Sequence, residues 1–333
     1  MVKNILFTLS FFSFFVLNAQ VQKTDFVLKP IGTSNVAEMN NRVDTVSVHH
    51  IAPAPYSSSD YAAKKAMLNA QRDAYYQRAN RRVDMDTTQP IGANMPYVEG
   101  GFTDSLTSFG IPNDNHMCVG NNGDVISVLN SSLRIYKGGS NLVYNVGLSY
   151  FGRVEPKNNW PNGKQPQTGS YDPKALYDPI ADRFTIIWLD GRVSTDSRIM
   201  VAISETNDAA GSYSIYHLEG NPLNDTSWTD YPILSQSEND LFITVNLLRD
   251  NQSWQTAFKQ SVIWQIDKKK LYGDKNLTTS LWSGIQHNGK SIWSICPVDQ
   301  YYKSPRKEMY FLSVRPSDLR KANTMKFKKL VKI

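Results

Sequence analysis

The sequence predicts an all-β fold built from recurring antiparallel units, and two patterns carry this prediction. From about residue 111 onward, short runs of β-branched and aromatic residues alternate with Gly, Asn, Asp and Pro. Such runs, with turn residues between them, are typical of antiparallel strands joined by short loops. In addition, matching residues recur every 58 positions, which indicates a repeated structural unit.

The N-terminus is typical of a secretory signal peptide. Lys3 precedes the apolar run ILFTLSFFSFFVL (5–17), and Ala19 is a small residue suited to cleavage. This run is too short for a transmembrane helix, which needs about 20 apolar residues, and no later run is longer. We therefore expect residues 1–19 to be a signal peptide, and the mature chain to be secreted and without a membrane span.

Residues 20–110 are predicted to form an N-terminal arm. Their composition is mostly polar, with scattered Pro and little periodicity. The exception is SSSDYAAKKAMLNAQRDAYYQRANRR (57–82), which starts with Ser and Asp and contains neither Gly nor Pro. Its Ala, Lys, Gln and Arg residues favour helices, so we expect one helix near 58–82.

Strand-like runs follow the arm. They are DVISVLN (124–130), LRIYK (133–137), RFTIIWLD (183–190), RIMVAIS (198–204), YSIYHLE (213–219), LFITVNLL (241–248), SVIWQID (261–267) and MYFLSV (309–314). Their close succession, with turn residues between them, predicts antiparallel meanders rather than helix-linked parallel strands.

The 58-residue repeat indicates which all-β fold these strands form. Its landmarks are Asp114, Asp172, Asp230 and Asn288. Four residues downstream of each landmark, the same repeat position is occupied by Cys118, Leu176, Leu234 and Ile292. A second repeat position, in the following strand, is occupied by Ile126, Phe184 and Phe242. Each unit has room for about four strands, which is the content of a β-propeller blade. The sequence therefore predicts about four four-stranded blades in residues 111–333, the fourth with an insertion at 299–308. Whether the ring is complete or truncated at Ile333 stays open.

Three stretches resemble a family of secreted β-propeller proteins of Bacteroidota, of the flavobacterial type. They are GIPNDNHMCVGNNGDVISVLNSSLRIY (110–136), YDPKALYDPIADRFTIIWL (171–189) and IMVAISETNDAAGSYSIYHL (199–218). The resemblance covers about residues 110–320 and implies a propeller without an established reaction. Many relatives carry a C-terminal sorting domain for type IX secretion, which has no counterpart in these 333 residues.

The repeat landmarks are the first candidates for a ligand-binding site. They are Asp114, Asp172, Asp230 and Asn288, expected near the starts of the innermost strands. Such places converge around the channel of a propeller, where a ring of oxygen ligands suits a hard cation such as Ca²⁺. The alternative is that each residue caps the turn into its blade through a hydrogen bond to the backbone. Spacing alone leaves both readings open.

The tripeptide Tyr-Asp-Pro occurs twice, at 171–173 and at 177–179. If the residues between are a strand, Asp172 and Asp178 lie about 20 Å apart at roughly 3.3 Å per residue. Glycosidase carboxylates lie about 5–9.5 Å apart, so these two cannot form such a pair. Asp178 is interpreted as a turn former before Pro179. Asp182, beside Arg183, is interpreted as part of a turn or an ion pair.

His116 and Trp160 complete the candidate ligand-binding residues. His116 lies at the start of the first unit and is the best-placed histidine. Trp160 lies in the long polar loop 157–170, and loops carry function more often than strands do. The sequence contains neither a Gly-x-Ser-x-Gly nucleophile motif nor a His-Glu-x-x-His zinc motif. No catalytic residue is predicted, and Ca²⁺ is the one cofactor considered.

The cysteines and the charge exclude some classes of protein. Cys118 shares its repeat position with Leu and Ile, so it is expected to be a small buried apolar residue. Cys296 belongs to the fourth unit, and a disulfide with Cys118 requires four blades that close the ring. The net charge of +6 is modest, without a zinc motif or a long basic stripe, so no nucleic-acid partner is expected.

Two functions remain for such a chain. The first is a secreted, non-enzymatic propeller that binds an extracellular glycan or protein, or acts as a scaffold at the cell surface. The second is a secreted hydrolase or lyase of polysaccharides with its site at the mouth of the channel, around Asp172, Asp114 and His116. The absence of a catalytic motif favours the first function.

Overall fold

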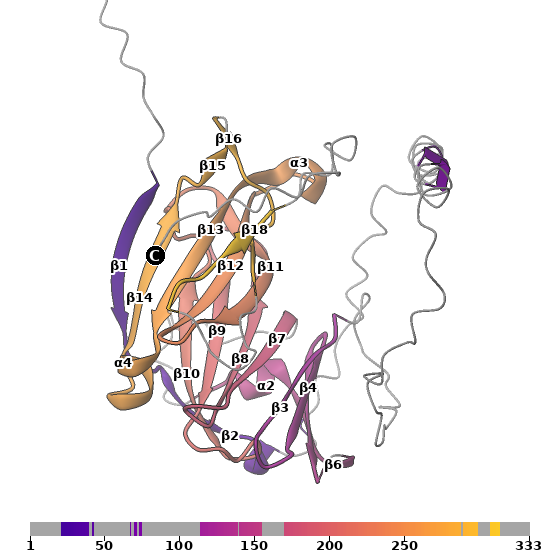
Figure 1. Cartoon of the computed structure of the whole chain (residues 1–333), viewed down its shortest axis with the longest axis vertical. Coiled ribbons are helices and arrows are strands. Elements are labelled where there is room, and N and C mark those ends of the chain that lie inside the picture. Colours follow the sequence, from indigo (N-terminus) through magenta and orange to yellow (C-terminus); the bar gives the residue numbers. More distant parts are fainter. Residues whose placement is uncertain are drawn as a thin grey trace, which may run out of the picture.

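The computed structural model describes residues 21–39, 42, 114–138, 140–154, 170–287, 289–298 and 307–313, and five isolated positions between 67 and 74. In this part the chain is mostly β and forms several antiparallel sheets with little helix (Figure 1). The prediction of an all-β, antiparallel fold is therefore confirmed. The predicted signal peptide, Trp160, Asn288 and most of the expected helix near 58–82 lie outside the described residues.

Three sheets each contain four strands that follow one another along the chain. Sheet 1 consists of β3 (His116–Val119), β4 (Val125–Leu129), β5 (Ser132–Lys137) and β6 (Asn141–Gly147). Sheet 2 contains β7 (Tyr171–Asp178), β8 (Arg183–Asp190), β9 (Arg198–Ser204) and β10 (Ser212–Glu219). Sheet 3 contains β11 (Ser227–Gln236), β12 (Asp240–Arg249), β13 (Phe258–Asp267) and β14 (Leu277–Ser283).

Two strands from the start of the chain extend sheets 2 and 3. β1 (Gln22–Leu28) pairs with β14, and β2 (Gly32–Asn35) pairs with β10, both antiparallel. A short 3₁₀ helix, η1 (Ala37–Met39), follows β2. The two strands cover the backbone edges that β14 and β10 would otherwise present to other chains.

The fourth unit is short within the described residues. It consists of two two-stranded sheets: β15 (Gln286–His287) with β16 (Lys290–Ser291), and β17 (Cys296–Pro297) with β18 (Phe311–Leu312). The expected strand at 309–314 is thus present as β18. Three complete four-stranded units are seen where about four were expected, and the described sheets show no closure into a ring.

Three short α-helices accompany the strands in the described residues, in addition to the isolated helical positions between 67 and 74. They are α2 (Leu148–Phe151), α3 (Trp254–Ala257) and α4 (Lys268–Gly273). Asp267 caps α4 through its carboxylate, which accepts a hydrogen bond from the Lys270 amide. No helix of the described part is long and apolar enough to cross a membrane.

The sheets pack face to face around two main cores. Side chains of sheets 1 and 2 form the first core, which includes Ile126, Phe184 and Trp188. Side chains of sheets 2 and 3 form the second, which includes Ile187 and Trp264. Because neighbouring residues of a strand point to opposite faces, Ile187 and Trp188 of β8 enter different cores. This burial on both faces explains why RFTIIWLD is almost continuously apolar.

A third core joins sheet 3 to the fourth unit. It contains Phe242 of β12, Phe311 of β18 and Ile292, and the rings of the two phenylalanines lie 5.7 Å apart. The second-strand positions of the repeat, Ile126, Phe184 and Phe242, are all fully buried. The innermost strands β3, β7, β11 and β17 are successive neighbours. The repeat therefore marks units that stand side by side.

A buried ion pair fastens sheet 2 to sheet 3. The Asp178 Oδ2 atom lies 2.7 Å from Lys268 Nζ, and both side chains are almost fully buried. Lys268 also donates to the Ser237 carbonyl. The other carboxylate oxygen of Asp178 accepts hydrogen bonds from the amides of Ile180 and Ala181. Asp178 is therefore the turn former that the sequence predicts, and in addition it binds the neighbouring sheet.

We predict that Lys268→Met lowers the free energy of unfolding by about 3–5 kcal/mol, because it leaves the Asp178 carboxylate buried without its cation. Urea denaturation measures this loss. The matched control is Lys275→Met, since Lys275 forms a 2.7 Å ion pair with Glu205 but is half exposed. That change should cost less than about 1 kcal/mol. Equal losses in the two variants would contradict the role of the buried pair.

Candidate functional site

Each innermost strand has one residue with a left-handed backbone, either shortly before the strand or at a bulge within it. These residues are Asp114, Asp172, Tyr231 and Ser294, with φ angles of +40°, +51°, +55° and +47°. Positive φ is uncommon outside glycine, is tolerated best by Asn and Asp, and is an outlier for a bulky residue. At Asp172 and Tyr231 the register with the next strand also shifts, as in a β-bulge. The shared conformation indicates that the four residues are structural equivalents.

The structure corrects the repeat in its third and fourth units. Asp114 and Asp172 occupy equivalent places, as the spacing of 58 suggests, but Tyr231 rather than Asp230 takes the third place. Ser294 takes the fourth, and Asn288 lies outside the described residues. The bulges of β7 and β11 match at Tyr171 and Asp230, which are 59 residues apart instead of 58, and the fourth strand begins later along the chain.

Two asparagines bind these strand starts from the preceding sheet. Asn130 donates to Asp114 Oδ2 (2.9 Å), and its side-chain oxygen accepts from the Asp172 amide (3.1 Å). In the same way, Asn246 accepts from the Ser294 amide (3.0 Å) and donates to the Ser294 hydroxyl (3.1 Å). Each asparagine thus fixes the start of the next innermost strand.

The carboxyl groups of Asp114, Asp172 and Asp230 lie close enough to influence one another. Burial raises the pKa of Asp172 to about 8, and the charges of Asp230 and Asp114 and a hydrogen bond with Asp114 add to the rise. Burial also raises the pKa of Asp230, with the charge of Asp114 contributing, whereas the Tyr231 amide and Arg192 oppose it. At neutral pH, Asp172 therefore holds a proton and can donate a hydrogen bond.

Basic and aromatic side chains surround the three carboxyl groups. The guanidinium of Arg192 lies 4.4 Å from the ring centre of Tyr171, and the Tyr171 hydroxyl donates to the Gly191 carbonyl (2.9 Å). His116 Nδ1 accepts a long hydrogen bond from the Ala175 amide (3.4 Å). Burial, followed by the charge of Lys174, lowers the pKa of His116, so its imidazole is neutral at pH 7. His116 therefore lies near the landmarks and ties β3 to β7.

Tyr231 was not among the residues that the sequence suggested for the site. Its side chain is 54% exposed, although its backbone is in the left-handed region. The signal for it was available in the sequence: Pro173 follows Asp172, and Pro232 follows Tyr231. Alignment on these prolines, instead of on the aspartates, matches Tyr231 to Asp172, each at the bulge of its strand.

The described residues do not supply a set of ligands for the calcium ring that the repeat suggested. Within them, no group of three or more His, Cys, Asp or Glu side chains is arranged to hold a metal ion. Asn288 and Trp160, two of the six predicted site residues, lie outside the described part. The structure thus brings the carboxyl groups of Asp114, Asp172 and Asp230 close together, whereas His116 contacts the Ala175 amide of β7.

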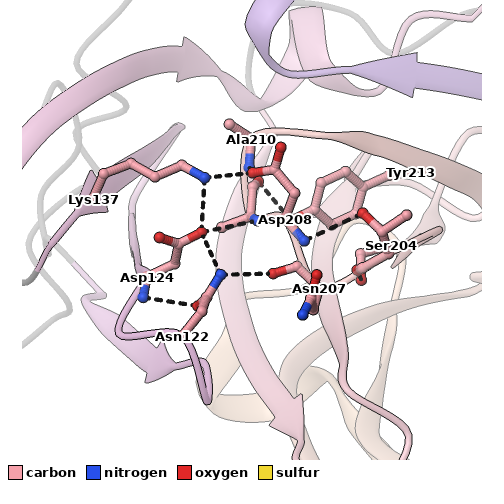
Figure 2. Close-up of polar contacts among 10 residues, drawn as sticks. Asn122, Asp124, Lys137, Ser204, Asn207, Asp208, Ala210 and Tyr213 are labelled. Carbon is pink, nitrogen blue, oxygen red and sulfur yellow. Dashed lines mark hydrogen bonds and ion pairs between the residues drawn. The ribbon is translucent and has the colours of Figure 1, made fainter.

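The motifs of the family resemblance meet between sheets 1 and 2 (Figure 2). Lys137 Nζ lies 2.9 Å from Asp124 Oδ2 and 2.5 Å from Asp208 Oδ1. Asn122 donates to Asp124 Oδ2 and to the Asn207 carbonyl, both at 3.1 Å. Asp124 is almost fully buried, so these contacts satisfy a carboxylate that would otherwise be costly to bury. The Gly-Asn-Asn-Gly-Asp and Thr-Asn-Asp segments therefore hold neighbouring sheets together.

Asp182 belongs to the same junction. It accepts hydrogen bonds from Asn207 (2.8 Å), from Asn121 (3.4 Å) and from the Tyr177 hydroxyl. Its φ of +59° places it in a tight turn between β7 and β8. The interpretation of Asp182 as a turn residue is confirmed, and its partners show that it also binds sheet 1 and the loop after β9.

Both cysteines of the chain are free. Cys118 packs against the first core, as its repeat position predicts. Burial raises the pKa of its thiol to about 12, so it is protonated and unreactive at neutral pH. Cys296 is exposed in β17.

No protein-family model, no curated protein and no solved structure matches the chain. The resemblance to secreted propeller proteins therefore stays a prediction, and the functional argument rests on the residues described above.

We predict that stability depends on pH through Asp172. A carboxyl group whose pKa is raised from 3.8 to about 8 favours the folded state less as pH rises through this range. Asp172→Asn removes the ionisation and keeps a residue that accepts positive φ. Between pH 5 and pH 8, the free energy of unfolding of the unsubstituted chain should fall by on the order of a few kcal/mol relative to the variant.

Urea denaturation at the two pH values measures this difference. The control is Asp25→Asn on β1, where a hydrogen bond from Ser280 lowers the pKa of an exposed carboxylate. Its effect on stability should be the same at pH 5 and pH 8, since Asp25 is ionised at both. If Asp172→Asn behaved like this control, the carboxyl cluster would not exist in solution.

Proposed function

We propose that the chain is a secreted β-propeller protein that acts without catalysis, by binding an extracellular glycan or protein at the starts of its innermost strands. Support for the propeller comes from the three four-stranded meanders and from the neighbouring innermost strands β3, β7, β11 and β17. Blades of a propeller have this content and this order around a centre. Secretion rests on the signal peptide pattern of residues 1–19.

The observation that carries the binding function is the exposed side chain of Tyr231, which occupies in β11 the left-handed place that Asp172 occupies in β7. A tyrosine with positive φ costs about 1–2 kcal/mol of backbone strain, which an exposed side chain does not recover through burial. Strain of this kind concentrates at functional positions. An exposed aromatic face offers stacking, and its hydroxyl can donate and accept hydrogen bonds. Sugars and peptide backbones both have matching groups.

One observation favours the second function, hydrolysis or elimination on a polysaccharide. Asp172 holds a proton at neutral pH beside Asp114, and a carboxyl group of raised pKa near a carboxylate is the acid of many glycosidases. Incubation of the purified chain with extracellular polysaccharides tests this function. Cleavage that Asp172→Asn abolishes would establish it and overturn the non-enzymatic proposal.

A glycan array and a panel of extracellular proteins, probed with the chain from Gln20 onward, test the proposed binding. We expect a ligand that is retained by the chain and lost in Tyr231→Gly, because the exposed ring is removed. Retention of that ligand by Tyr231→Gly, or the failure of both panels to yield any ligand, would contradict the proposal.

Tyr231→Gly should also raise the free energy of unfolding, by about 1 kcal/mol, because glycine adopts positive φ without strain. Thermal or urea denaturation measures this gain. The matched control is Lys275→Gly, at another position with positive φ (+57°) near the outer strand β14. It relieves strain at a position outside the site, so ligand binding should be unchanged. A loss of binding in both variants would show a general effect on the fold.

A further inference from the structure

β1 is attached to sheet 3 by one edge and buries none of its seven residues (Figure 1). Phe26 and Leu28 are half-buried against the second core, and Val27 is 66% exposed. The specific side-chain contacts are few. The Phe26 ring lies 5.7 Å from that of Trp264, and Ser280 donates to the Asp25 carboxylate (2.5 Å). Backbone pairing with β14 therefore holds β1 in place.

The neighbouring strand β2 is fixed much more firmly. Ser34 and Val36 are fully buried, and Ile31 nearly so. Backbone hydrogen bonds also hold the residues on either side of β2: the Ile31 amide donates to the Ile215 carbonyl, and the Val36 amide donates to the Gly211 carbonyl. Segments with few buried side chains open at lower free-energy cost than segments that belong to the core. β1 can therefore detach while β2 stays bound.

Strands β11–β14 supply the buried side chains of the second core on the side of sheet 3, and β1 adds only the half-buried Phe26 and Leu28. In β14, Leu277, Thr279, Leu281 and Ser283 are buried and alternate with half-buried residues. Sheet 1 consists of four strands in the described part of the chain, without a fifth strand. Detachment of β1 therefore leaves a complete four-stranded sheet whose outer edge, β14, offers unpaired backbone groups to an extended strand.

The segment between β1 and β2 is short and could act as the hinge for an exchange of β1. It consists of Lys29 and Pro30, which lie before the anchored Ile31, and it links a strand on sheet 3 to a strand on sheet 2. Short hinge segments of this kind favour the exchange of a terminal element between copies, since each copy forms the same contacts as in the monomer. The extended strand that fits β14 best is β1 itself, whose seven residues pair with it in register.

We propose that β1 is an exchangeable strand and that the outer edge of β14 accepts β1 from a second copy of the chain. Two copies then join by reciprocal strand exchange, which gives the protein a means of self-assembly separate from the proposed ligand site. The exchange creates no new contacts, so concentration and the hinge set its extent.

A mixing experiment with single cysteines tests the exchange. One chain carries Asp25→Cys and the other Ser280→Cys, because these residues are directly opposite in the β1–β14 pair. Opposite residues of antiparallel strands lie at a distance that a disulfide can span. Cys296→Ala in both chains removes the exposed native thiol. A disulfide-linked heterodimer on non-reducing gels forms only if β1 of one copy lies on β14 of the other.

The control replaces Asp25→Cys by Thr24→Cys, whose side chain points to the opposite face of β1. This pair should give no heterodimer above background. In a chain that carries both Asp25→Cys and Ser280→Cys, tenfold dilution before oxidation should lower the ratio of linked dimer to internally linked monomer about tenfold. Internally linked monomer alone at every concentration, without a heterodimer in the mixture, would overturn the proposal.

Discussion

Everything in this structure depends on the packing of the innermost strands against one another. β3, β7, β11 and β17 are successive neighbours, so each sheet except those at the ends of the series must bury both of its faces. This requirement explains the nearly continuous apolar sequence of β8 and the assignment of Ile187 and Trp188 to different cores. Because the innermost strands are neighbours, the polar side chains of Asp114, Asp172 and Asp230 also lie close to one another. A carboxyl cluster results, in which Asp172 is the residue that cannot ionise freely.

Polar residues in this chain divide into two groups by what they contact. Those of the first group join sheets: the ion pair of Asp178 with Lys268, and that of Lys137 with Asp208. The motifs behind the family resemblance belong mostly to this group, which explains why they indicate a fold more than a reaction. The second group lies around the left-handed residues of the innermost strands, where burial raises the pKa of Asp172 and the side chain of Tyr231 is exposed.

Much of the fold could be predicted from the sequence, because strands that are buried on both faces consist almost entirely of β-branched and aromatic residues. The repeat also located the buried positions Ile126, Phe184 and Phe242 correctly. β1 and β2 escaped prediction because an edge strand needs only backbone pairing, and its side chains are largely free to be polar. Tyr231 and Ser294 were missed for another reason: a fixed spacing of 58 cannot follow an additional residue between two units or a later strand start. The pairing of Asp178 with Lys268 joins distant parts of the chain, and no local pattern indicates it.

The central claim is that packing of the innermost strands places Asp172 between the carboxyl groups of Asp114 and Asp230. Its most direct test is the pKa of Asp172 itself, measured by carbon-13 NMR titration of the aspartate carboxyl groups, with Asp172→Asn to assign the resonance. The account predicts a pKa of about 8 for Asp172. A value close to 3.8, the ordinary value for an aspartate, would contradict it.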